Sequence, residues 1–250
     1  MHRHEHVVQL YGSDEGLLTR TVCQFLAEGL SRGDGLVLVA TPQHTEAFAS
    51  GLAECGLDVP RIVSEGRLAV LDAETMLDRL MVDGMPDPQR FDEAIVPELK
   101  SVRRRSGSAV VTAYGEMVGI LWSAGQVAAA ERLEALWNAM LELGGLRLFC
   151  AYAIDLLGQG WDSAAVSPIF ASHTATLPAG EEFEWALSRA MADVLGPDAE
   201  PLRRRLETAG SAGVAAGTAV AAALVAERHA RAREILDRAR YYQTSRPIQA

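Results

Sequence analysis

The first strand–turn–helix unit of the chain carries acidic residues where a phosphate-binding loop would carry a lysine. Residues 6–10 are predicted to form a short buried strand and residues 17–30 an amphipathic helix. In P-loop nucleoside triphosphatases, the turn between two such elements holds the phosphates with its backbone N–H groups, and a lysine at the helix start reaches the terminal phosphate. The turn here contains Asp14 and Glu15, and the only lysine of the chain is Lys100. These carboxylates satisfy the helix start, so the sequence predicts a nucleotide-binding architecture without its phosphate chemistry.

The charge of the chain limits its partners. The formal net charge is -10 over 250 residues, with a sequence pI near 5.1. Nucleic acids and anionic membrane surfaces are themselves negative, so neither is an expected partner. The first five residues are polar and lack the apolar stretch of a signal peptide, which predicts a cytoplasmic protein.

No metal site is predicted. Cys23, Cys55 and Cys150 are odd in number, far apart and set among apolar residues, which favours buried reduced thiols over disulfides or a zinc site. His2 and His4 alternate with His6, and an extended segment would point all three to one face, where they could bind a transition metal. A frayed terminus with solvated histidines is the preferred interpretation.

Short apolar runs alternate with helical patterns along the first two thirds of the chain. Buried strands are predicted at residues 6–10, 35–40, 67–72, 109–113 and 146–154. Helices are predicted at 17–30, 43–55, 90–105 and 116–143, the last broken near Gly125, and residues 82–88 are predicted to form a loop. The alternation predicts a doubly wound three-layer α/β sandwich with a mainly parallel sheet. Its ligand crevice would lie at the carboxyl ends of the strands.

After about residue 176, the alternation of strands and helices gives way to short helical segments separated by Pro and Gly. We expect an α/β domain over residues 1–178 and a helical extension over 179–250, with helices at 181–195, 200–208 and 214–242. The uncharged stretch 209–226 consists mainly of Ala and Gly, so a membrane span is disfavoured. Its small residues, Gly213, Gly217 and Ala221, would suit either packing on the same chain or a homo-oligomer contact.

A series of short motifs resembles a known family. They are His6-Val7-Val8-Gln9-Leu10-Tyr11, Gly33-Asp34, Val37-Leu38-Val39-Ala40-Thr41-Pro42 with His44, Gly66-Arg67-Leu68, Leu71-Asp72-Ala73, Phe91, Tyr114-Gly115-Glu116-Met117-Val118, Leu121-Trp122, Leu133-Glu134, Leu136-Trp137-Asn138, Cys150-Ala151-Tyr152, and a closing phrase with His173 and Leu177-Pro178. In this order they resemble the MEDS domain, the sensory module of DcmR-type regulators, over residues 5–178.

The resemblance implies a RecA/KaiC-like fold without a Walker A loop, and ligand or signal sensing in bacterial regulation without catalysis. It supplies no ligand and no cofactor. Such domains are often fused to histidine kinases or DNA-binding modules, but residues 179–250 show neither pattern. Output through a regulatory protein partner or through self-association of the C-terminal helices is therefore expected.

Nine residues near the predicted strand ends are expected to line the ligand site: Tyr11, Gly12, Asp14, Thr41, His44, Asp72, Tyr114, Glu116 and Tyr152. Glu116 follows an apolar strand, at the position where RecA-like ATPases hold Mg²⁺ or orient a water. It is interpreted as a ligand or partner contact, and the alternative is a cap of the following helix. Asp72 is interpreted first as a helix N-cap. His44 is either a donor in the crevice or an ordinary first-turn histidine.

The preferred hypothesis is a non-catalytic cytoplasmic sensor that binds a small molecule or a partner segment and regulates transcription or signalling through protein contacts. The competing hypothesis is a divergent nucleotide-binding protein or NTPase, in which Glu116 and Asp72 handle Mg²⁺ and an arginine replaces the lysine. Arg20 is the nearest candidate, but it lies about a turn into the helix. A purely structural scaffold is the third alternative.

Overall fold

The fold is that of a computed structural model, which describes residues 5–158, 163–209, 215–226 and 230–245. The chain divides into two compact units, one of residues 1–8 and 14–152 and the other of residues 9–13 and 153–250. The strand β1 (Glu5–Leu10) contributes to both. The prediction of a domain boundary at residue 178 remains a prediction.

The main sheet has six strands, in the order β3-β2-β6-β7-β1-β8. Its strands are β1, β2 (Gly35–Ala40), β3 (Leu68–Asp72), β6 (Val111–Gly115), β7 (Leu146–Tyr152) and β8 (Ala175–Thr176). β2 pairs in parallel with β3 and β6, and β6 pairs in parallel with β7. Every residue of β2 and β6 is buried, as expected of parallel strands covered on both faces. The α/β class and the parallel sheet are confirmed.

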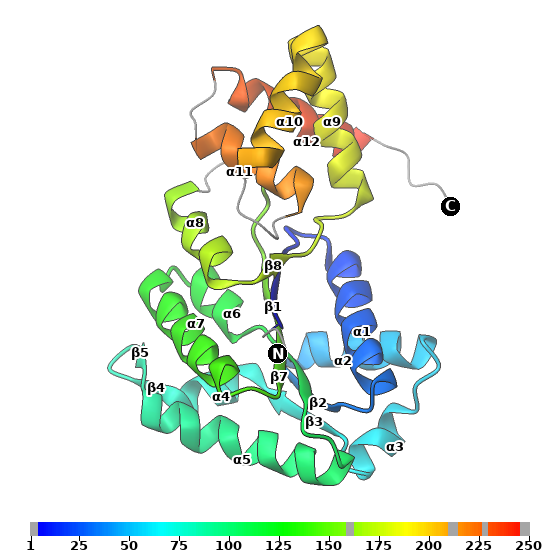
Figure 1. Cartoon of the computed structure of the whole chain (residues 1–250), viewed down its shortest axis with the longest axis vertical. Helices are drawn as coiled ribbons and strands as arrows, with labels where there is room; N and C mark the ends of the chain where they lie inside the picture. The colour runs from blue at the N-terminus through cyan, green and yellow to red at the C-terminus, as the bar shows by residue number, and fades with distance from the viewer. Residues whose placement is uncertain (1–4, 159–162, 210–214, 227–229, 246–250) are drawn as a thin grey trace. The chain divides into compact units, whose positions relative to one another are not determined.

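Helices cover both faces of the sheet in the first unit. α1 (Glu15–Ser31) and α2 (Pro42–Glu54) lie on one side of the sheet, and α6 (Met117–Ser123) and α7 (Val127–Glu142) lie on the other (Figure 1). The short helices α3 (Val59–Ser64) and α4 (Ala73–Leu80) and the longer α5 (Pro88–Ser106) complete the unit. α5 packs against β2, β3 and β6, and it carries the exposed Lys100. The predicted three-layer sandwich is confirmed.

A glycine allows α1 to lie close to the sheet. A Cβ atom added to Gly29 would lie 2.7 Å from the Cβ and Oγ1 atoms of Thr112 on β6. Thr112 in turn donates a hydrogen bond of 2.8 Å to the carboxylate of Asp34, and both side chains are buried. The close contact between Gly29 and Thr112 and the buried hydrogen bond between Thr112 and Asp34 therefore hold the turn between α1 and β2 against β6.

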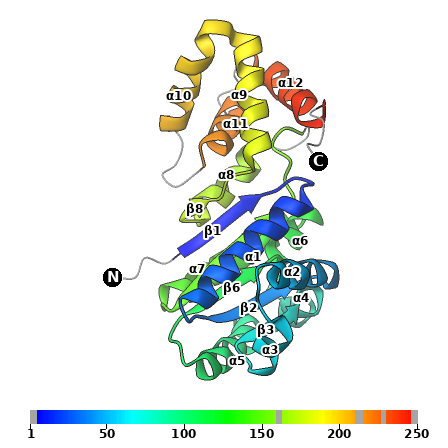
Figure 2. The same cartoon turned by 90° about the vertical axis from the view of Figure 1, so that its right-hand side faces the viewer.

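The second unit contains α8 (Ser163–Ser172), α9 (Glu181–Leu195), the 3₁₀ turn η1 (Gly196–Asp198), α10 (Ala199–Ala209), α11 (Ala216–Ala226) and α12 (Ala232–Ser245). α9, α10, α11 and α12 form a group of their own (Figure 2). Gly217 and Ala221 are buried within it, and the Gly217 N–H donates to Glu184 of α9 at 3.0 Å. Packing on the same chain thus accounts for these two small residues. Gly213 lies outside the described residues.

Several predicted boundaries were wrong. The segment 214–242, predicted as one helix, covers α11 and most of a second helix, α12, which ends at Ser245. The predicted strand 109–113 is displaced to 111–115, and the predicted loop 82–88 contains a small antiparallel hairpin of β4 (Met81–Val82) and β5 (Met85–Pro86). The helices α3 and α8 and the strand β8 were not predicted.

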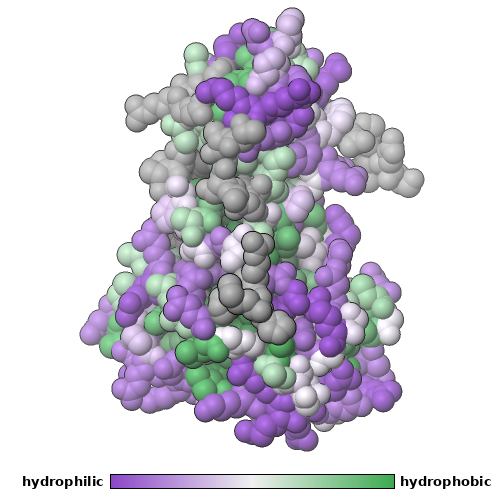
Figure 3. All heavy atoms as spheres, in the orientation of Figure 1, coloured by the Kyte–Doolittle hydropathy of each residue, from purple (hydrophilic) through white to green (hydrophobic). Residues whose placement is uncertain are grey.

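Hydrophilic side chains cover much of the face shown in Figure 3, with apolar side chains between them. Among the described residues, no helix is long and apolar enough to cross a membrane.

Candidate functional site

Glu116 directly follows β6 and precedes α6, and its side chain makes its contacts with other elements than α6. It occupies the N-cap position of α6, but its side chain makes no capping hydrogen bond. One carboxylate oxygen accepts a hydrogen bond from the backbone N–H of Thr41, and the other contacts the Nδ1 atom of His44. The hydroxyl of Tyr114 donates to the same second oxygen at 3.3 Å. Glu116 is therefore the N-cap residue of α6, as the alternative interpretation expected, but its side chain does not cap the helix by a hydrogen bond.

His44 comes to Glu116 because α2 starts directly after β2. Thr41 is the N-cap of α2 and Pro42 is its first residue, both common signals for a helix start. The Thr41 hydroxyl accepts a hydrogen bond of 3.4 Å from the backbone N–H of His44. This cap orients the first turn of α2, so the imidazole faces the end of β6.

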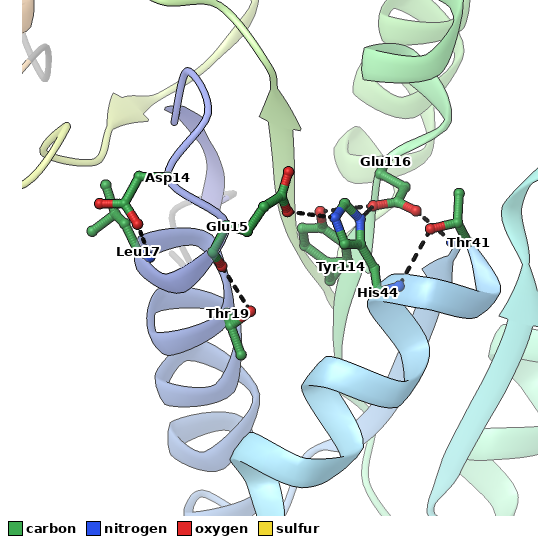
Figure 4. A network of polar contacts seen from close by, with 8 residues as sticks. All are labelled: Asp14, Glu15, Leu17, Thr19, Thr41, His44, Tyr114 and Glu116. Atoms are coloured by element: carbon green, nitrogen blue, oxygen red, sulfur yellow. Dashed lines mark hydrogen bonds and ion pairs between the residues drawn. The ribbon is translucent and has the colours of Figure 1, made fainter.

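The second imidazole nitrogen of His44 meets α1. Its Nε2 atom lies 2.7 Å from a carboxylate oxygen of Glu15, and the ring lies between the two carboxylates (Figure 4). We call Glu15, Thr41, His44, Tyr114 and Glu116 the rim network. It joins α1, α2 and β6, all within the first compact unit.

The rim network holds a positive imidazolium between two negative groups. The hydrogen bond to Glu116 raises the pKa of His44 to about 9, with a smaller contribution from Glu15, although burial of the ring opposes this rise. The side chains of His44 and Glu116 are 15% and 7% exposed, whereas that of Glu15 is 55% exposed. His44 is therefore charged at neutral pH. Its partner Glu116 is shielded from solvent, whereas its partner Glu15 reaches solvent.

Two predicted site residues cap helices. Asp14 is the N-cap of α1 and accepts a hydrogen bond of 2.8 Å from the backbone N–H of Leu17. Asp72 caps α4 by accepting a hydrogen bond of 2.8 Å from the backbone N–H of Thr75. Hydrogen bonds from Thr75, first from its side chain and then from its backbone, lower the pKa of the Asp72 carboxyl. The interpretation of Asp72 as an N-cap is confirmed.

The rim network as defined does not include the three remaining predicted residues. Tyr152 is the last residue of β7, at a strand end as predicted, but it is buried and its hydroxyl donates a hydrogen bond of 2.6 Å to Glu134 of α7. Tyr11 and Gly12 belong to the turn after β1 and to the second compact unit. Gly12 has a φ of 61°, and an added Cβ would contact Asp155 at 3.5 Å.

Aromatic rings connect the rim network to the core. The His44 ring packs on Phe48 with centroids 5.5 Å apart, and Phe48 meets Tyr114 edge to face at 5.2 Å. Tyr114 meets Phe149 of β7 at 5.4 Å. Sequence reasoning missed Phe48 and assigned Glu15 only to the helix dipole. The available signal was the spacing of Phe48 four residues after His44, one turn along the same helix face.

A surface groove of about 620 Å³ lies between α1 and α2. Its lining includes Arg20, Cys23, Glu54 and Cys55. Cys55 is exposed, contrary to the prediction that all three cysteines are buried, whereas Cys23 and Cys150 are buried as predicted. The groove does not include residues of the rim network, so it is a separate feature of the α1–α2 surface.

The comparison with protein families identifies the domain. The MEDS family, the methanogen/methylotroph DcmR sensory domain, matches residues 5–174. The chain belongs to the MEDS family. The matched segment includes every residue of the rim network. No curated protein matches the chain.

Proposed function

We propose that this MEDS protein is a non-catalytic sensor in which the rim network responds to a small-molecule ligand. The observation that carries the proposal is the engagement of Glu116. A carboxylate at this position of a RecA-like ATPase holds Mg²⁺ or orients a water. Here it accepts from the Thr41 N–H and contacts a positive His44, which leaves it poorly suited to a cation or a catalytic water.

The exposure of the two carboxylates indicates how a ligand would enter. Glu116 is shielded, whereas Glu15 is more than half exposed and holds His44 by a single contact. A small molecule with a hydrogen-bond-accepting oxygen replaces Glu15 on His44 Nε2. The charged imidazolium provides a strong donor for such an oxygen, because charge-assisted hydrogen bonds are about twice as strong as neutral ones.

Displacement of Glu15 gives the signal. Glu15 is in the first turn of α1, and its contact with His44 links α1 to α2. Releasing that link changes the relative stability of two arrangements of the helices, and a ligand that prefers one shifts the population by its differential affinity, typically about 1–3 kcal/mol. The output is contact with a regulatory protein or with a second copy of the chain, which controls transcription or signal transduction.

Calorimetric titration of the full chain tests the proposal. Small carboxylates, alcohols and amides are titrated in parallel with ATP and GTP, each with and without Mg²⁺. Binding of one of the small compounds is expected, with its affinity reduced at least about tenfold in His44→Gln, because a bond from a charged donor contributes about 1.5–3 kcal/mol. Glu46→Gln, an exposed change on the same helix, is the matched control.

The nucleotide arm decides between sensor and enzyme. No nucleotide binding is expected at micromolar concentration, since α1 is capped by Asp14 and the chain has no lysine in this turn. Micromolar binding of Mg-ATP, or turnover abolished by Glu116→Gln, would overturn the proposal. Native mass spectrometry of the protein from its own host would report a retained ligand and the number of subunits together.

A further inference from the structure

Three side chains with metal-binding atoms meet on the other face of the sheet from α1. His6 lies on β1, Cys150 on β7 and Glu134 on α7, and all three are buried. His6 Nε2 lies 3.4 Å from the Cys150 sulfur and 3.4 Å from the Oε2 atom of Glu134. The metal-binding atoms of the three residues all lie within 4.8 Å of one another.

Two neighbours orient these atoms. The Nδ1–H of His6 donates to the Oδ1 atom of Asn138, one turn after Glu134 on α7, at 2.9 Å. With the ring proton on Nδ1, the Nε2 lone pair faces Cys150 and Glu134. Tyr152 donates to Glu134 Oε1 at 2.6 Å, which directs the other carboxylate oxygen toward His6. Such outer hydrogen bonds to ligand histidines and carboxylates are typical of metal sites.

Two of the three separations between these atoms fit the edges of a tetrahedral site. With bonds of about 2.1 Å to nitrogen or oxygen and about 2.3 Å to sulfur, neighbouring ligand atoms of a tetrahedral zinc site lie about 3.4–3.6 Å apart. Both distances from His6 Nε2 agree with this edge length. The ligand types also discriminate, because a thiolate with an imidazole suits Zn²⁺, whereas Mg²⁺ and Ca²⁺ prefer sites made of oxygen atoms.

We propose that His6, Glu134 and Cys150 bind a transition-metal ion, with Zn²⁺ as the preferred ion, inside the α/β unit. Asn138 and Tyr152 position the imidazole and the carboxylate. The sequence disfavoured a zinc site because of ligand spacing, since His6 and Cys150 are 144 positions apart and meet only because β1 and β7 are neighbours in the sheet. The proposed metal site is separate from the rim network. Phe149 contacts Tyr114 of the rim network, whereas the next residue, Cys150, points to the opposite face of β7.

The test is the metal content of the full chain, produced with added Zn²⁺ or Co²⁺ and purified without chelator. We expect about one ion per chain by elemental mass spectrometry, as for a single mononuclear site. The cobalt form should show a thiolate-to-cobalt charge-transfer band and the visible absorption of tetrahedral Co²⁺. Both should be lost in Cys150→Ser and His6→Gln and retained in Cys23→Ser and Cys55→Ser, since these two thiols lie elsewhere.

Two further variants keep the proposal falsifiable if Cys150→Ser or His6→Gln does not fold. Tyr152→Phe removes only a hydroxyl and should weaken metal binding about 10- to 100-fold, as loss of an outer-shell partner does. A double variant, His2→Ala with His4→Ala, should retain the ion. A wild-type chain that retains no metal, a cobalt spectrum without a thiolate band, or loss of the ion in the His2 and His4 variant would each overturn the proposal.

Discussion

Replacing His44 by glutamine should remove the part of the pH dependence of stability between pH 6.5 and about 9.5 that arises from the imidazole. In the folded chain the imidazole lies between Glu116, which follows β6, and Glu15 on α1, with the Tyr114 hydroxyl on the same Glu116 oxygen. These contacts favour the protonated form and raise the pKa of His44 from 6.5 to about 9. Glutamine keeps a side-chain amide but cannot carry the charge.

The magnitude follows from linkage between protonation and folding. Each unit of pKa corresponds to about 1.4 kcal/mol, so this rise corresponds to about 3 kcal/mol of unfolding free energy. Because the folded pKa is above the unfolded one, the whole contribution is present below pH 6.5 and is lost as the pH rises through about 9. The wild-type protein should therefore be about 3 kcal/mol less stable at pH 10 than at pH 6 from this source.

Urea denaturation at pH values from 6 to 10 measures this difference. Other groups titrate in the same range, so the quantity of interest is the wild-type free energy minus that of His44→Gln at each pH. Glu46→Gln, exposed on the same helix, should leave the wild-type curve unchanged. If the difference between wild type and His44→Gln does not vary with pH, the imidazole is not held in its charged form and the reasoning fails.

Three further changes test the fold. Gly29→Ala should lower the unfolding free energy, measured by urea denaturation, by about 1–3 kcal/mol, because the added methyl group overpacks against Thr112. The control Gly16→Ala, at an exposed position, should not lower it. If Gly29→Ala is as stable as the wild type, α1 does not approach β6 as closely as described. Thr112→Val should cost about 1–3 kcal/mol because it deprives the buried Asp34 of a donor, and Thr112→Ser should recover part of this loss. A thiol reagent should react quickly with one cysteine per native chain and with none in Cys55→Ser, because Cys23 and Cys150 are buried and burial raises the pKa of both thiols, that of Cys23 to about 11.

Local patterns predicted the main elements of the fold. The apolar run 35–40 coincides with β2, and helix 181–195 coincides with α9, since hydrophobic periodicity and helix-ending residues are read from neighbouring positions. The β4–β5 hairpin was missed because strands of two residues carry almost no periodic signal. Such strands depend on tertiary contacts, and β5 packs against α7.

The candidate site was predictable only in part. His44 and Glu116 were both expected near the carboxyl ends of parallel strands, and the structure brings them into direct contact. The involvement of Glu15 depends on how α1 packs on α2, which no local pattern specifies. The meeting of His6 with Cys150 depends on strand order, for the same reason. The ligand-binding role of these residues stays a prediction.

The exposed Lys100 on α5 gives this protein a practical property. It carries the only ε-amino group of the chain. An amine-reactive fluorophore or surface linker attached there would sit on a helix packed against β2, β3 and β6, at a known point of the α/β unit. Immobilised or labelled molecules would then share one side-chain attachment point, which suits the protein to orientation-controlled biosensing.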